Sequence, residues 1–159
     1  MKKEILSIKY QICQEHELGE DEKKLVEKAK AATLTSYSPY SGFAVGAAVL
    51  LQSGEIISGS NQENAAYPSG TCAERCAMFY ANAQYPETPI RAIAIAARKS
   101  DGEYTASPVT PCGSCRQVLI ETEHRFHQNI QTILYGTNEI YITEKAGDLL
   151  PFQFNGDSM

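Results

Sequence analysis

Two short stretches of the chain carry residues that could do chemistry. They are Thr71-Cys72-Ala73-Glu74-Arg75 and Pro111-Cys112-Gly113-Ser114-Cys115. On its own, a Cys-x-x-Cys pair fits a redox couple, half of a structural zinc site or a chance pairing. Cys72 lies 40 residues upstream of Cys112 and is also predicted to open a helix, whose dipole stabilises a thiolate. Because zinc binds thiolates at about 2.3 Å in tetrahedral sites, three convergent cysteines predict a zinc centre with one position left open.

Glu74 is the candidate proton carrier of this centre. It follows Cys72 by two residues, which is about 200° around a helix. In the first turn it should therefore lie near the metal without binding it. The main alternative uses Cys76, which shares a helical face with Cys72 and could complete a closed, non-catalytic site of four cysteines. Otherwise Cys76 is a small buried hydrophobe.

The two stretches resemble zinc-dependent nucleoside and base deaminases, which share His/Cys-x-Glu followed by Pro-Cys-x-x-Cys. They are most similar to the small homo-oligomeric cytidine deaminases, with Cys-Ala-Glu-Arg and an all-cysteine zinc site, over about residues 36–154. The resemblance implies one Zn²⁺ per chain on Cys72, Cys112 and Cys115, with Glu74 as catalytic residue. It also implies that Arg75 donates hydrogen bonds to ligand sulfurs. The reaction expected is hydrolytic deamination of cytidine and deoxycytidine to uridine and deoxyuridine, with release of ammonia.

The same resemblance predicts the substrate contacts. Asn61 and Glu63 stand in an Asn-x-Glu-Asn segment whose first Asn and Glu hold the ribose hydroxyls. Phe43 would pack beside the pyrimidine ring, and Ala73 would also contact the substrate. Phe154 has the spacing of a phenylalanine that reaches a neighbouring subunit's pocket, although Phe152 competes for that role. These features imply a homotetramer with shared active sites.

The hydrophobic pattern predicts elements that could position these residues. Helices are expected over 20–34 and 72–84 and from 112 onward, and strands over 43–51, 55–58, 90–97 and 132–135. Alternation of Leu6, Ile8, Tyr10 and Ile12 predicts a further strand, at a sheet edge. The prediction is one α/β domain over residues 1–159, a three-layer α/β/α sandwich with a mixed sheet of about five strands, as in cytidine deaminases. Residues 1–18 form an N-terminal extension to it.

Composition narrows the range of partners and compartments. The chain has 159 residues, 43% hydrophobic and 21% charged, with 14 basic and 19 acidic side chains and a net charge of −5. An acidic excess argues against a nucleic acid polymer as partner, including polynucleotide editing. No apolar window is long enough to span a membrane, and the N-terminus does not resemble a secretory signal, so a cytoplasmic protein is expected. Five cysteines, an odd number, also favour a reducing compartment.

The sequence is also compatible with other substrates and with a non-enzymatic function. A related cytosine-containing compound, such as a nucleotide or a blasticidin-type antibiotic, could be the substrate, or the chain could be a non-enzymatic zinc-binding module. The Asn61-x-Glu63 element favours a sugar diol, and no basic cluster suggests a phosphate site. His124 and His127 fall at or beyond the far end of the helix predicted from residue 112 and are expected at the surface.

Overall fold

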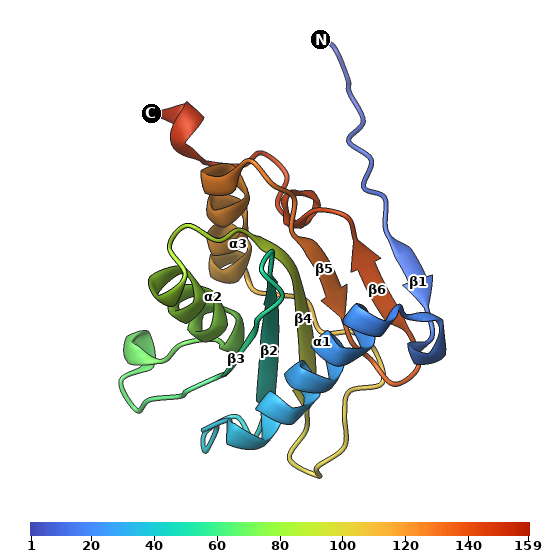
Figure 1. Cartoon of the computed structure of the whole chain (residues 1–159), viewed down its shortest axis with the longest axis vertical. Coiled ribbons are helices and arrows are strands. Elements are labelled where there is room, and N and C mark those ends of the chain that lie inside the picture. Colours follow the sequence, from blue (N-terminus) through green and yellow to red (C-terminus); the bar gives the residue numbers. More distant parts are fainter.

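A six-stranded mixed sheet forms the centre of the computed structural model, which describes residues 1–159 (Figure 1). The strands are β1 (Gln11–Cys13), β2 (Ala44–Leu51), β3 (Ile56–Ser60), β4 (Ile90–Arg98), β5 (Gln131–Leu134) and β6 (Ile140–Thr143). Their order is β1-β6-β5-β4-β2-β3, and only β4 and β5 are parallel neighbours. A parallel pair needs a crossover connection, which α3 (Gly113–Phe126) provides.

Helices cover both faces of the sheet. α1 (Glu20–Ala32) packs on one face, whereas α2 (Ala73–Gln84) and α3 pack on the other. β2 contributes to both cores, because Ala47 and Val49 face α2 and α3 while Ala48 and Leu50 face α1. A strand buried on both faces explains the continuous apolar run in the sequence. The predicted three-layer sandwich with a mixed sheet is confirmed.

The prediction of about five strands was one short, and the N-terminal strand is shorter than expected. β6 is the missed strand, and its four residues are too few to show a clear period. The predicted strand over 6–12 is reduced to Gln11–Cys13, which pairs antiparallel with β6 at the sheet edge. Because β6 is so short, residues 1–10 have no neighbour in the sheet and no regular secondary structure.

Both cysteine motifs begin helices, as predicted. Cys72 is the N-cap of α2 and Cys112 is the N-cap of α3, and both have extended backbone angles. Cys115 follows in the first turn of α3. None of the three helices has the length and apolar character needed to cross a lipid bilayer.

One glycine sets how closely α2 approaches the sheet. A Cβ atom built on Gly59 of β3 would lie 2.6 Å from the backbone nitrogen of Ala77 and 2.7 Å from the carbonyl oxygen of Ala73. Real Cβ atoms essentially never come within 3.0 Å of other heavy atoms. Any larger residue at position 59 would therefore push away the helix that begins at Cys72.

Candidate metal centre

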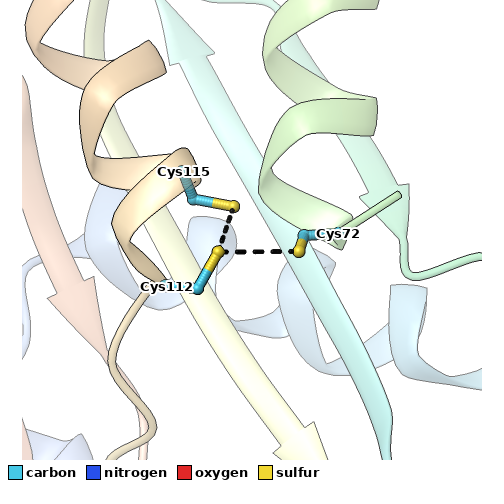
Figure 2. A group of neighbouring side chains, drawn as sticks. All are labelled: Cys72, Cys112 and Cys115. Carbon is cyan, nitrogen blue, oxygen red and sulfur yellow. Dashed lines mark hydrogen bonds between the residues drawn. The ribbon is translucent and has the colours of Figure 1, made fainter. Parts of the chain in front are cut away.

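Three cysteine sulfurs converge between the starts of α2 and α3 (Figure 2). The Sγ atoms of Cys72 and Cys112 are 3.8 Å apart, and those of Cys112 and Cys115 are 3.5 Å apart. All three lie within 4.8 Å of one another. Sulfurs bound tetrahedrally to zinc at about 2.3 Å are separated by about 3.8 Å. The donor set and its spacing therefore fit zinc, and Cys72, Cys112 and Cys115 are placed to hold the ion.

The surroundings favour thiolate at Cys72. Hydrogen bonding from the Cys115 thiol and from Arg75 lowers the pKa of Cys72 to about 5, although burial acts in the opposite direction. Arg75 Nη2 lies 3.6 Å from Cys72 Sγ, and this contact raises the pKa of Arg75 further. The same pairing with Cys72 raises the pKa of Cys115. Arg75 thus supplies positive charge beside a ligand sulfur.

Cys76 does not complete a four-cysteine site. The metal-binding group contains Cys72, Cys112 and Cys115, and no other cysteine, histidine, aspartate or glutamate joins it. The Cβ of Cys76 lies only 2.8 Å from where a Cβ on Gly59 would stand, so Cys76 packs toward β3. Burial raises the pKa of its thiol. The protein therefore offers three ligands, which is the number found in catalytic zinc sites that bind a water molecule.

Glu74 stands beside the sulfurs but outside their group. It lies in the first turn of α2 and is only 5% exposed. Burial raises the pKa of Glu74, and the nearby charge of Cys72 adds to the effect. A carboxyl group whose pKa is moved toward neutrality can both accept and donate a proton at physiological pH.

A cavity of about 620 Å³ opens onto these groups. It brings the metal ligands Cys72 and Cys112 together with most of the other residues singled out in the sequence, namely Phe43, Asn61, Glu63, Ala73, Glu74 and Arg75. Its volume lies in the usual range for small-molecule sites. Phe154 is not among the lining residues: it is 60% exposed, and its carbonyl accepts a hydrogen bond from Gln117 of α3.

Asn61 also has a structural role that its sequence context did not reveal. Its Oδ1 accepts hydrogen bonds from Val45 N at 2.8 Å and Ser36 Oγ at 2.6 Å, and its Nδ2 donates to the Phe43 carbonyl at 2.9 Å. The amide therefore clamps the start of β2 and fixes the backbone of the predicted aromatic wall. These are long-range contacts, which a motif alone does not specify.

Glu63 holds the turn at the cavity mouth. Its carboxylate accepts hydrogen bonds from Ser41 Oγ at 2.5 Å and from Tyr40 N at 2.8 Å. The Ser41 bond lowers the pKa of Glu63, so the side chain is ionised. Tyr40 and Tyr67, which no sequence motif marks, meet edge to face with ring centroids 6.2 Å apart and line the cavity. Their only sequence signal is an aromatic residue beside proline in each of two loops.

Comparisons with known proteins agree with this geometry. Residues 19–130 match the family model described as the cytidine and deoxycytidylate deaminase zinc-binding region. The cytidine deaminase of Halalkalibacterium halodurans is 44% identical over 147 residues, covering 87% of this chain and 98% of the relative. That of Sporosarcina psychrophila is 38% identical over 129 residues, covering 81% and 82%.

Solved structures give the same result. The crystal structure of cytidine deaminase from Burkholderia pseudomallei has a TM-score of 0.71 at 40% identity, with 82% of this chain and 97% of that chain covered. The Mycobacterium tuberculosis enzyme has a TM-score of 0.64 at 31% identity, covering 84% and 97%. With three converging thiols, a buried glutamate beside them and these relatives, the chain belongs to the zinc-binding cytidine and deoxycytidylate deaminase family.

Proposed function

We propose that this protein deaminates cytidine and deoxycytidine hydrolytically, giving uridine or deoxyuridine and ammonia. The observation that carries the proposal is that a three-thiol metal centre and the buried carboxyl group of Glu74 share one cavity of nucleoside size. The relatives named cytidine deaminase support it, because they match most of the chain.

Glu74 is the proton carrier in this reaction. Zinc, when bound by Cys72, Cys112 and Cys115, supplies a Lewis acid that makes water a nucleophile near neutral pH. Glu74 takes a proton from the attacking water and delivers it to the ring nitrogen, while the water oxygen bonds to the ring carbon that bears the amine. Glu74 then takes the remaining proton of this new hydroxyl group and gives it to the amine, which leaves as ammonia when the carbon–nitrogen bond breaks. Its raised pKa suits both directions of transfer. Arg75 offsets the negative charge of the thiolates through its contact with Cys72.

The remaining cavity residues orient the nucleoside. Phe43 forms a flat apolar wall for the base, and Ala73 lies beside it at the start of α2. Asn61 and Glu63 bind the sugar hydroxyls. Each side chain either keeps its hydrogen bonds within the protein while it binds the sugar or gives one of them up for the sugar. Arg75 is the only lysine or arginine that lines the cavity, and it already contacts Cys72. A nucleoside therefore fits better than a nucleotide, whose phosphate would have no free cationic partner.

The proposal includes the assembly and its surroundings. We propose one domain over residues 1–159 and a homotetramer in which Phe154 enters a neighbouring subunit's cavity. The exposure of Phe154 and its absence from the lining of its own chain's cavity support this, although Phe152 is more exposed still. All five cysteines are free, which suits the reducing conditions of the cytoplasm.

The test is ultraviolet detection of cytidine loss, with zinc measured on the same samples. Wild-type protein should bind one zinc per chain and turn over cytidine. Glu74→Ala should keep the zinc and lose about 10²–10⁴-fold in rate. The matched control is Glu121→Ala, which removes an exposed glutamate of α3. Wild-type protein that binds zinc without turnover would identify a binding module, and equal rates in the two variants would remove Glu74 from the mechanism.

A second assay tests the sugar contacts. Glu63→Ala should lower kcat/KM for cytidine much more than for dideoxycytidine, which lacks the hydroxyl groups that Glu63 would bind. Cytidine monophosphate should be the poorer substrate of the wild-type protein. If Glu63→Ala affects cytidine and dideoxycytidine equally, Glu63 only holds the Tyr40–Ser41 turn.

A further inference from the structure

The N-terminal arm, residues 1–12, exposes an alternating row of apolar side chains. Leu6, Ile8, Tyr10 and Ile12 are 65%, 44%, 54% and 56% exposed. Figure 1 shows the segment continuing from β1 and leaving the body of the molecule as an extended chain. Such alternation is typical of a strand with one buried face. In the single chain that face is not buried.

The base of the arm is held firmly by the fold. Gln14 Nε2 donates to the carbonyl of Asn138 at 2.8 Å. Glu15 accepts from Lys30 Nζ at 3.1 Å and from the Tyr135 hydroxyl at 3.3 Å. These contacts tie the residues after β1 to α1 and to the chain that follows β5. The arm therefore starts from a fixed position and direction.

The arm is also an open sheet edge. β1 pairs with β6 on one side over Gln11–Cys13 and has no strand on its other side. Residues of the arm and of the chain around the end of β6 line a hollow of about 450 Å³. Tyr10 packs on its own chain, with its ring centroid 5.3 Å from that of Tyr141, but it stays 54% exposed. An apolar edge strand with free backbone groups is a template for another strand.

We propose that this edge pairs with the arm of a second copy of the chain, antiparallel, about a twofold axis at Ile8. In that register Ile8 faces Ile8, and Leu6 faces Tyr10 of the other copy. The apolar residues of both arms then share one face of a sheet that continues from one copy into the next. An axis at Lys9 would instead place two lysines directly opposite each other.

Charge favours the same antiparallel arrangement. The tip of the arm carries Lys2 and Lys3 against a single acidic residue, Glu4, which pairs with Lys2, whereas its base is followed by Glu15 and Glu17. Antiparallel pairing brings each basic tip beside the other copy's acidic base, and a parallel arrangement would bring like charges together. The twofold axis makes the contact self-complementary and closed.

The arm lies outside the part of the chain that defines the family. The family match begins at residue 19. Relatives are covered over 97–98% of their length by only 82–87% of this chain. The proposed contact is therefore an interface additional to the part of the chain that matches the family, and it does not depend on the proposed catalytic function.

Disulfide trapping tests the register. In zinc-loaded full-length protein with Cys13→Ser, Ile8→Cys should form a disulfide dimer under mild oxidation, because facing residues have Cα atoms about 4.5–5.5 Å apart. Leu6→Cys is the matched control, from the same face. In the proposed register the two copies of position 6 are four residues apart along the paired strands. This distance of about 14 Å is too long for a disulfide. Dimer formation at position 8 with none at position 6 supports the proposal, and equal trapping or none at either position overturns it.

Amide hydrogen exchange gives a second readout that needs neither cysteines nor activity. Alternate amides of residues 5–10, those that point to the other arm, should exchange slowly in the wild-type protein and about tenfold or more faster in Ile8→Lys, which puts two lysines opposite each other. Amides of α2 and α3 serve as internal controls and should not change. Fast exchange over residues 5–10 in the wild type, or slow exchange in both proteins, would show that the arms do not pair in this way.

Discussion

Replacing Gly59 with alanine should damage the metal centre without touching any of its ligands. The added Cβ would lie 2.6 Å from the backbone nitrogen of Ala77 and 2.7 Å from the carbonyl oxygen of Ala73. Both are backbone atoms of α2, so no side-chain rotation can relieve the contact. The helix has to move away from β3.

The displacement follows from the contact distances. Ordinary contact begins at 3.4 Å, which exceeds the closest approach by about 0.8 Å. α2 carries Cys72 at its N-cap and Glu74 in its first turn, whereas Cys112 and Cys115 belong to α3. The shift would therefore separate Cys72 from the other two sulfurs. Misplacement of a catalytic group by about 1 Å lowers the rate by about 100-fold, and overpacking a core destabilises a protein by about 1–3 kcal/mol.

The assay combines zinc content after dialysis, kcat/KM for cytidine and chemical denaturation. Gly59→Ala should bind zinc more weakly, lose about 100-fold in kcat/KM and lose about 1–3 kcal/mol of unfolding free energy. Gly113→Ala is the matched control. It also adjoins a ligand at a helix start, but a Cβ there meets no heavy atom within 4 Å. It should keep zinc and activity.

Two results would refute this reasoning. If Gly59→Ala retained wild-type zinc affinity and rate, the spacing between α2 and β3 would not control the site. If Gly113→Ala lost as much activity as Gly59→Ala, the loss would reflect any change near a ligand and not the close approach at β3.

Three further outcomes follow from the contacts described above. Cys76→Ser should keep stoichiometric zinc and cytidine turnover, because Cys76 lies outside the sulfur cluster; loss of zinc would contradict this. Glu123→Ala should lower the unfolding free energy by about 2–4 kcal/mol in a denaturant titration, because its carboxylate accepts three backbone N–H groups from later segments. In zinc-free protein, Glu74→Gln should be more stable than wild type at pH 7 and equal to it near pH 4. Folding raises the pKa of Glu74 above its ordinary value of 4.5, so the wild type alone loses stability as the pH rises above 4.5. A difference in unfolding free energy between the two proteins that did not change with pH would contradict the raised pKa.

The parts of the fold that the sequence determined are those with a local cause. Continuous or alternating apolar residues predicted β2 and β4, and the helical spacing of apolar residues predicted α1 and α2. These predictions succeed because the period of the apolar side chains is a property of each segment's own sequence. The starts of α2 and α3 at Cys72 and Cys112 were likewise predicted from the motifs. β6 was missed because four residues carry too little of any period.

The tertiary structure alone decided which distant residues meet. Cys72 and Cys112 are 40 residues apart, and their sulfurs are 3.8 Å apart only because α2 and α3 pack side by side on one face of the sheet. The exclusion of Cys76 depends on its packing against Gly59, and the clamp made by Asn61 depends on the pairing of β3 with β2. The exposure of the arm depends on where β6 ends. Local patterns specify what each segment becomes, whereas contacts between segments are set by the packing of the whole chain, which no short stretch contains.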